Sequence, residues 1–249
     1  MEVFLSGIGW VTSAGFGWGK QGGECTLADL PLRSPSRKEV FPEPNQRFGR
    51  MSDYSKVGLG AVAFALRDAG LETWSTKRTI GVVVATQLGC LVTDLDYHRS
   101  VLLEGGGLAS PNLFAYTLAN CFLGEAAIQF GLTGSSVAIN EAREGLDSLC
   151  IAIEDLAMGE ADTMLAGICD LAVPEAFAGQ VTLLPGALFI VLSAAPNPAT
   201  ESYGTVTLTD NGLLYNGLAV ASLIELVQAA LAGRAAPTHF DKTLQPRKP

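Results

Sequence analysis

The chain has 249 residues and a net charge of −9, which argues against the basic surface that nucleic acids and anionic membranes require. Its length suits one large domain or two small ones, with enough residues to bury a core. The composition, with 48% hydrophobic and 16% charged residues and 28 glycines, favours a layered α/β protein over a coiled coil or a disordered chain.

Strands and helices are expected to alternate along the chain. A first strand, 3–6, precedes a glycine-rich turn and an irregular stretch, 19–50. A small-residue helix over 55–69 ends at Gly70, and the continuous apolar run 80–85 is typical of a strand covered on both faces. Residues 86–109 form a loop with a short helical piece. After this loop we expect helices over 113–130, 142–158 and 218–231 and strands over 137–139, 164–167, 188–192 and 204–208. This order predicts a mainly parallel sheet with helices on both faces.

We expect a single domain over 1–234, followed by a proline-rich and poorly ordered tail over 235–249. The N-terminus lacks the basic and then apolar pattern of a signal peptide, and the longest apolar stretch, 183–196, is too short to span a bilayer. The five cysteines show neither CxxC nor Cys/His spacing. We therefore expect a cytoplasmic protein with buried, reduced thiols, no metal site and no cofactor.

The run 135–150 holds the most informative residue. It predicts a short β-branched strand that turns sharply into an amphipathic helix. Many enzymes place a nucleophile at such a turn, because the free N–H groups of the helix start favour developing negative charge. Here the turn carries Arg143, whose guanidinium stays protonated and cannot act as a nucleophile.

The stretch 109–170 resembles the N-terminal half of a β-ketoacyl synthase, of the thiolase fold. It matches without gaps the family's GLxGPS strand, its nucleophile turn and its GEAD-x-M-x-AG strand. The segments SGIGWVTSAGFG (6–17), RMSDYSKVGLGAVAFALRDAGL (50–71) and TIGVVVATQLG (79–89) resemble the opening, the first long helix and the second strand of the family. The resemblance implies a thiolase-like α/β/α layering that keeps mainly the N-terminal half, with the C-terminal half largely deleted.

The departures from the family pattern imply that condensing activity is lost. Arg143 occupies the position of the cysteine that carries the acyl chain as a thioester. Residues 211–238 resemble the family's second histidine motif, and Tyr215 stands at the histidine position. The segment of the first histidine is missing on this alignment, and His98 and His239 lie outside both motifs.

Family members without the cysteine are chain-length factors, which pair with an active ketosynthase, and truncated subunits of this kind occur in aryl-polyene pathways. The resemblance therefore implies a non-catalytic subunit in a heterodimer with a full-length β-ketoacyl synthase, with 109–145 facing the partner. Glu141 and Arg143 belong to the residues predicted to face the partner or line its tunnel. Leu118 aligns with a residue that gates the acyl pocket, and we expect it to help shape the tunnel together with Phe114, Tyr116 and Phe122. The alternative is that these four side chains are ordinary helix core.

Arg143 allows two interpretations. It is either a drifted residue that pairs with Glu141 or Glu144, or it points into the former pocket or across the interface and holds a carboxylate. A buried arginine needs a partner, so we expect an acidic or carbonyl group within hydrogen-bond distance.

Two other functions stay open: residual decarboxylation of malonyl-carrier protein, and a homodimeric acyl-binding or scaffold protein. Acyl carrier proteins are strongly acidic, so at a net charge of −9 we expect carrier docking to fall to the partner.

Overall fold

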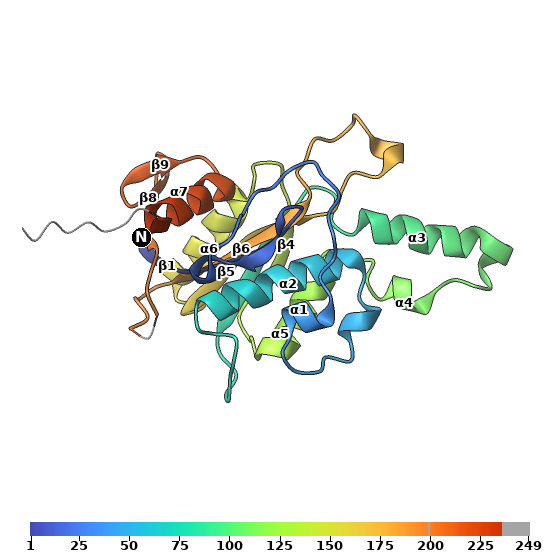
Figure 1. Ribbon diagram of the computed structural model, residues 1–249, viewed down its shortest axis with the longest axis horizontal. Coiled ribbons are helices and arrows are strands. Elements are labelled where there is room, and N and C mark those ends of the chain that lie inside the picture. The colour runs from blue at the N-terminus through green and yellow to red at the C-terminus, as the bar shows by residue number, and fades with distance from the viewer. Residues whose placement is uncertain (199, 236–249) are drawn as a thin grey trace, which may run out of the picture.

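The computed structural model describes residues 1–198 and 200–235, which are organised around one mixed β-sheet (Figure 1). In the described residues, nine strands form this sheet in the order β4-β3-β5-β6-β1-β7-β8-β9, with β2 paired to β1. The strands are β1 (Glu2–Thr12), β2 (Gly15–Trp18), β3 (Ile80–Thr86), β4 (Ser136–Asn140), β5 (Thr163–Asp170), β6 (Gly186–Ser193), β7 (Gly204–Thr209), β8 (Gly212–Tyr215) and β9 (Leu218–Val220).

The α/β class with helices on both faces of a mixed sheet is confirmed, but the predicted predominance of parallel pairs is wrong. Strand β3 is parallel to β4 and β5, whereas the other six described pairings are antiparallel. A parallel neighbour requires a crossover, usually a helix. The connection from β5 to β6 holds only a three-residue 3-10 helix (Glu175–Phe177), and the chain returns antiparallel.

Helices cover both faces of the sheet. Helices α2 and α5 pack on one face, whereas α6 and α7 pack on the other. Alternate residues of β6 enter the two apolar cores, which explains why this strand is buried along its whole length. The helices are α1 (Arg37–Val40), α2 (Asp53–Asp68), α3 (Leu91–Leu102), α4 (Pro111–Phe114), α5 (Cys121–Phe130), α6 (Leu146–Met158) and α7 (Leu223–Ala235).

The SGIG segment lets α2 lie directly on β1. A Cβ atom at Gly9 would collide with the backbone of Ala61 and Ala65 in α2, and one at Gly7 would collide with Ala65 and Ala69. Strand β1 is therefore continuous through the segment that the sequence predicted as a glycine-rich turn, and these glycines serve close packing.

The segment 86–109, predicted as a loop with a short helical piece, contains the twelve-residue helix α3. Three other helices have bounds that differ from those predicted. The expected helix 113–130 is broken into α4 and α5, and at the break Thr117 donates its hydroxyl proton to Phe114 O at 2.9 Å. Helix α6 begins at Leu146 and not at 142, because Glu144 and Gly145 have positive φ angles. The segment 218–231 starts as strand β9, and Ser222 then accepts the N–H of Glu225 at the start of α7.

The predicted tail lies outside the described residues, apart from Ala235 at the end of α7. None of the helices that the structure describes combines the length and the apolarity that a membrane crossing requires. Two cysteine thiols, Cys90 and Cys169, are buried, whereas the other three are half-buried, so the expectation of uniformly buried thiols is only partly correct.

Candidate functional site

The connection between β4 and α6, residues 141–145, is a tight turn at the end of the parallel strands. Glu144 (φ 53°) and Gly145 (φ 85°) adopt the left-handed conformation one after the other. A Cβ atom at Gly145 would collide with Ile168 and Leu223, so the turn needs glycine both for its backbone angle and for space. The turn is also joined to α7, because Leu223 donates its N–H to Glu144 O at 3.1 Å.

Glu141 is the buried carboxylate of this turn, with 9% of its surface exposed. It accepts three backbone N–H groups, from Arg143 at 3.1 Å, Gly145 at 2.7 Å and Asp147 at 2.6 Å. The chain thus places its own negative charge where the start of α6 offers free donors and the positive end of its dipole.

Arg143 lies on the surface, so the alternative that it points into the former pocket is wrong, whereas a contact across an interface stays a prediction. Its side chain is 60% exposed, and its guanidinium forms an ion pair with Asp147, to which Nε donates at 3.3 Å. The expected acidic partner is therefore present, but it is Asp147, one helical turn further on, and not Glu141 or Glu144.

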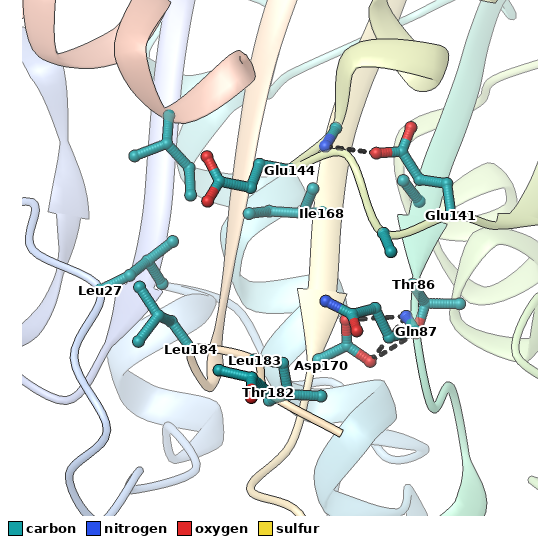
Figure 2. A pocket seen from close by; sticks show the side chains of 14 residues that line it. Leu27, Thr86, Gln87, Glu141, Glu144, Ile168, Asp170, Thr182, Leu183 and Leu184 are labelled. Atoms are coloured by element: carbon teal, nitrogen blue, oxygen red, sulfur yellow. Dashed lines mark hydrogen bonds between the residues drawn. The ribbon is translucent and has the colours of Figure 1, made fainter. Parts of the chain in front are cut away.

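A cavity of about 330 Å³ lies beside the turn, as Figure 2 shows. The side chain of Glu144 points into it, while Glu141 and Asp170 lie at its border (Figure 2). Its remaining wall is largely apolar, formed by Leu27, Ala85, Ala142, Ile168, Leu183, Leu184 and Ile224 together with Thr86, Gln87, Gly145 and Thr182.

Asp170 fastens the end of β3 to the end of β5. Its carboxylate accepts Thr86 Oγ1 at 2.8 Å, the N–H of Gln87 at 3.0 Å and the N–H of Leu88 at 2.9 Å. Burial raises the pKa of this carboxyl above the usual aspartate value, although the hydrogen bonds act in the opposite direction. Our sequence analysis missed Asp170; its signal is an acidic residue directly after a buried apolar strand.

Tyr215, the predicted histidine position, does not line the cavity. It is buried in β8, and its hydroxyl donates to Tyr203 O at 2.6 Å. Of the segment that resembles the histidine motif, it is the start of α7 that reaches the turn, with Ile224 in the cavity wall. The structure therefore does not bring Arg143 and Tyr215 together as the remains of one catalytic centre.

None of the four side chains predicted to shape the tunnel lines this cavity. Two of them are buried and two are exposed. Phe122 is fully buried against Tyr54 and Phe189, and Tyr116 is 8% exposed, so ordinary core packing describes both. Phe114 and Leu118 lie on the surface, with 62% and 64% exposed. The break between α4 and α5 does not separate the buried from the exposed side chains, since buried Tyr116 and exposed Leu118 both lie between these two helices.

No group of three or more histidine, cysteine or acidic side chains within the described part of the chain is arranged to hold a metal ion. The arrangement at the turn offers a filled set of N–H donors, carboxylates and an outward-facing arginine. The turn carries no thiol at position 143, and the N–H groups of Arg143, Gly145 and Asp147 are already bonded to Glu141.

Comparisons with known proteins match a region of the chain that includes the turn 141–145. The family described as "Beta-ketoacyl synthase, N-terminal domain" matches residues 32–182. A putative polyketide β-ketoacyl synthase 1 from Streptomyces virginiae is 28% identical over 78% of this chain and 46% of its own length. A 3-oxoacyl-[acyl-carrier-protein] synthase 2 from Vibrio cholerae is 32% identical over 47% of this chain and 29% of its own. The chain thus spans at most about half the length of these relatives.

Solved structures show the same fold. The ishigamide ketosynthase/chain length factor superposes with a TM-score of 0.66 at 18% identity, over 83% of this chain and 66% of that one. A ketosynthase in complex with its chain length factor from Xenorhabdus doucetiae gives a TM-score of 0.57 at 13% identity, over 79% and 81%.

Proposed function

Because the chain belongs to the β-ketoacyl synthase N-terminal domain family, we propose that it is a non-catalytic, chain-length-factor-like subunit that pairs with an active ketosynthase. The observation that carries this proposal is Arg143 at the turn between β4 and α6, where a condensing enzyme needs a thiol. An exposed guanidinium paired with Asp147 cannot hold an acyl group as a thioester.

Two features of the segment 102–137 support pairing with another subunit. Among the described residues, strand β4 pairs only with β3, so its other edge has no strand neighbour there. Thirteen large apolar side chains are exposed in the described residues, and seven of them fall in this stretch: Leu102, Leu103, Leu108, Phe114, Leu118, Ile128 and Val137. A free strand edge and a concentration of exposed apolar groups are features of a protein–protein interface.

The partner that we propose is a full-length β-ketoacyl synthase, in a heterodimer in which β4 extends the partner's sheet. The solved complex of a ketosynthase with its chain length factor is a precedent among proteins of this fold. At a net charge of −9 this chain attracts an acidic acyl carrier protein poorly, so we assign carrier docking to the partner.

Co-expression with intact β-ketoacyl synthases of its own genome tests the proposal. We expect one of them to co-purify in a stable one-to-one complex, and condensation to depend on the cysteine of that synthase. A chain that stays monomeric and ignores every synthase would contradict the pairing. Turnover of malonyl-carrier protein by the isolated chain would show an enzyme instead.

Tunnel shaping is the finer part of the proposal, and it falls to the exposed members of the predicted set. Leu118 would line the partner's acyl tunnel and limit product length by steric exclusion. Leu118→Ala in the complex should lengthen or blur the product distribution. Ile128→Ala is a matched control, because Ile128 is exposed to the same 64%. The same product distribution in both variants would remove the gating role.

A further inference from the structure

The turn 141–145 is closed to a nucleophile by a second feature besides the loss of the cysteine. Backbone N–H groups at the start of a helix stabilise an anion only while they are free to point at it. In this chain the donors of Arg143, Gly145 and Asp147 converge on one carboxylate, that of Glu141, at 2.6–3.1 Å.

We propose that Glu141 is a built-in anion that occupies the N–H groups at the start of α6 and so prevents thiolate chemistry at position 143. This inference rests on the proposed non-catalytic function and adds a residue-level cause to it. Glu141 acts here as a positioning residue, which holds the turn and fills its donors.

The charges around position 143 act in the same direction. Apart from Arg143 itself, the charged groups that face this position in the described structure are carboxylates. Glu141 and Glu144 lie in the same turn, Asp147 lies on α6, and Glu225 on α7 borders the surface hollow that Arg143 lines. A thiolate at position 143 would therefore meet occupied donors and like charges, both of which disfavour the anion.

Glu144 supplies a matched control. It carries the same charge, lies in the same turn and borders the same cavity. Its backbone carbonyl accepts the N–H of Leu223, but its carboxylate accepts none of the three N–H groups that Glu141 holds. A Glu→Gln change at either position removes one charge, and only the change at Glu141 weakens the set of three hydrogen bonds.

The experiment introduces a thiol with Arg143→Cys and measures its pKa from the pH dependence of iodoacetamide alkylation. The single variant should have a thiol pKa at or above the ordinary value of about 8.5. Adding Glu141→Gln should lower this pKa by about one unit, which raises the thiolate fraction at neutral pH about tenfold. Adding Glu144→Gln should lower it by less than half as much. Adding Glu141→Asp, which keeps the carboxylate, should not lower the thiol pKa.

A low thiol pKa in the single variant, or equal shifts from Glu141→Gln and Glu144→Gln, would overturn the inference. Circular dichroism of each variant verifies that the chain is folded, and Arg143→Cys with Glu141→Asp keeps the comparison informative if the Gln variant does not fold. The outcome is separate from the proposed function. The complex with a synthase can form whatever the thiol pKa is, and a thiol of high pKa does not depend on a partner.

Discussion

The two edges of the sheet are built differently. Strand β4 presents a five-residue edge with Val137 38% exposed, and its side-chain row includes exposed polar groups at Ser136 and Asn140. Strand β9 has three residues and follows two left-handed positions, Asn216 (φ 47°) and Gly217 (φ 82°). A short edge bounded by a tight turn resists pairing with another strand, whereas a longer β-branched edge favours it. This difference agrees with the proposal that β4, and not β9, pairs with the partner subunit.

The largest effect is expected from a charge on the β4 edge. Val137→Asp should weaken the complex with the synthase about 100-fold or more, because an unpaired charge would be buried in the joined sheet. Leu218→Asp is the control on the β9 edge, where Leu218 is 73% exposed, and it should leave the complex unchanged. Size-exclusion chromatography with light scattering measures both variants. Equal losses of binding, or none in either, would contradict the difference between the edges.

A buried carboxylate, that of Asp68, stabilises the β9 side of the molecule through hydrogen bonds. The side chain of Asp68 on α2 is fully buried, and it accepts the N–H of Ile8 at 2.8 Å, the N–H of Lys20 at 2.7 Å and the hydroxyl of Tyr203 at 2.7 Å. Tyr203 immediately precedes β7, so this carboxylate connects α2 and β1 to the start of the β7–β9 meander.

Asp68→Ala should therefore lower the free energy of unfolding by about 3–5 kcal/mol, because it leaves several buried donors unpaired beside Lys20. Urea unfolding of the purified chain measures this change. Asp53→Ala, at an exposed acidic residue in the first turn of the same helix, should change it by less than about 1 kcal/mol. If Asp68→Ala lowered the free energy of unfolding no more than Asp53→Ala, the stabilising role of Asp68 would be contradicted.

A smaller effect is expected at Tyr215, whose hydroxyl donates to the Tyr203 carbonyl. Tyr215→Phe keeps the ring in the core and removes one hydrogen bond, so it should lower the free energy of unfolding by about 1 kcal/mol. Binding to the synthase should not change, because this residue serves the β9 side. Thermal unfolding and the pull-down test the two statements separately. Loss of the complex without loss of stability would instead place Tyr215 at the interface.

Much of this architecture is readable from residue patterns. The apolar run 80–85 gives a strand buried on both faces, and the small-residue run 55–69 gives the helix that lies on β1. The turn near Arg143 was located both by its strand-to-helix pattern and by the family resemblance. These features depend on local sequence and on burial, which apolar periodicity reports well.

Other features depend on backbone geometry that residue types do not determine. A glutamate has no preference for the left-handed region, so nothing in the sequence placed Glu144 there. The three hydrogen bonds of Glu141 depend on how the turn folds, and one interpretation of the sequence instead made Glu141 or Glu144 the ion-pair partner of Arg143. The antiparallel return of β6 likewise depends on tertiary packing.

Asp170 gives the last and smallest test, on the β4 side. Its carboxylate accepts hydrogen bonds from Thr86 and Leu88 and so holds the loop after β3, the strand that pairs with β4. Burial raises its pKa in the folded state above the unfolded value, so its proton is bound more tightly when the chain is folded. Its titration therefore contributes stability that is fully present below the unfolded pKa of about 3.9 and is lost as the pH rises through the folded pKa.

Asp170→Asn removes this contribution, and the stability advantage of the natural chain over the variant should grow as the pH falls from 7 toward 4. Urea unfolding at several pH values measures the difference, with the carboxyl ¹³C titration of Asp170 as a direct check. An advantage that shrinks toward acid, or a carboxyl that titrates below the usual aspartate range, would mean that the hydrogen bonds to Thr86 and Leu88 outweigh burial.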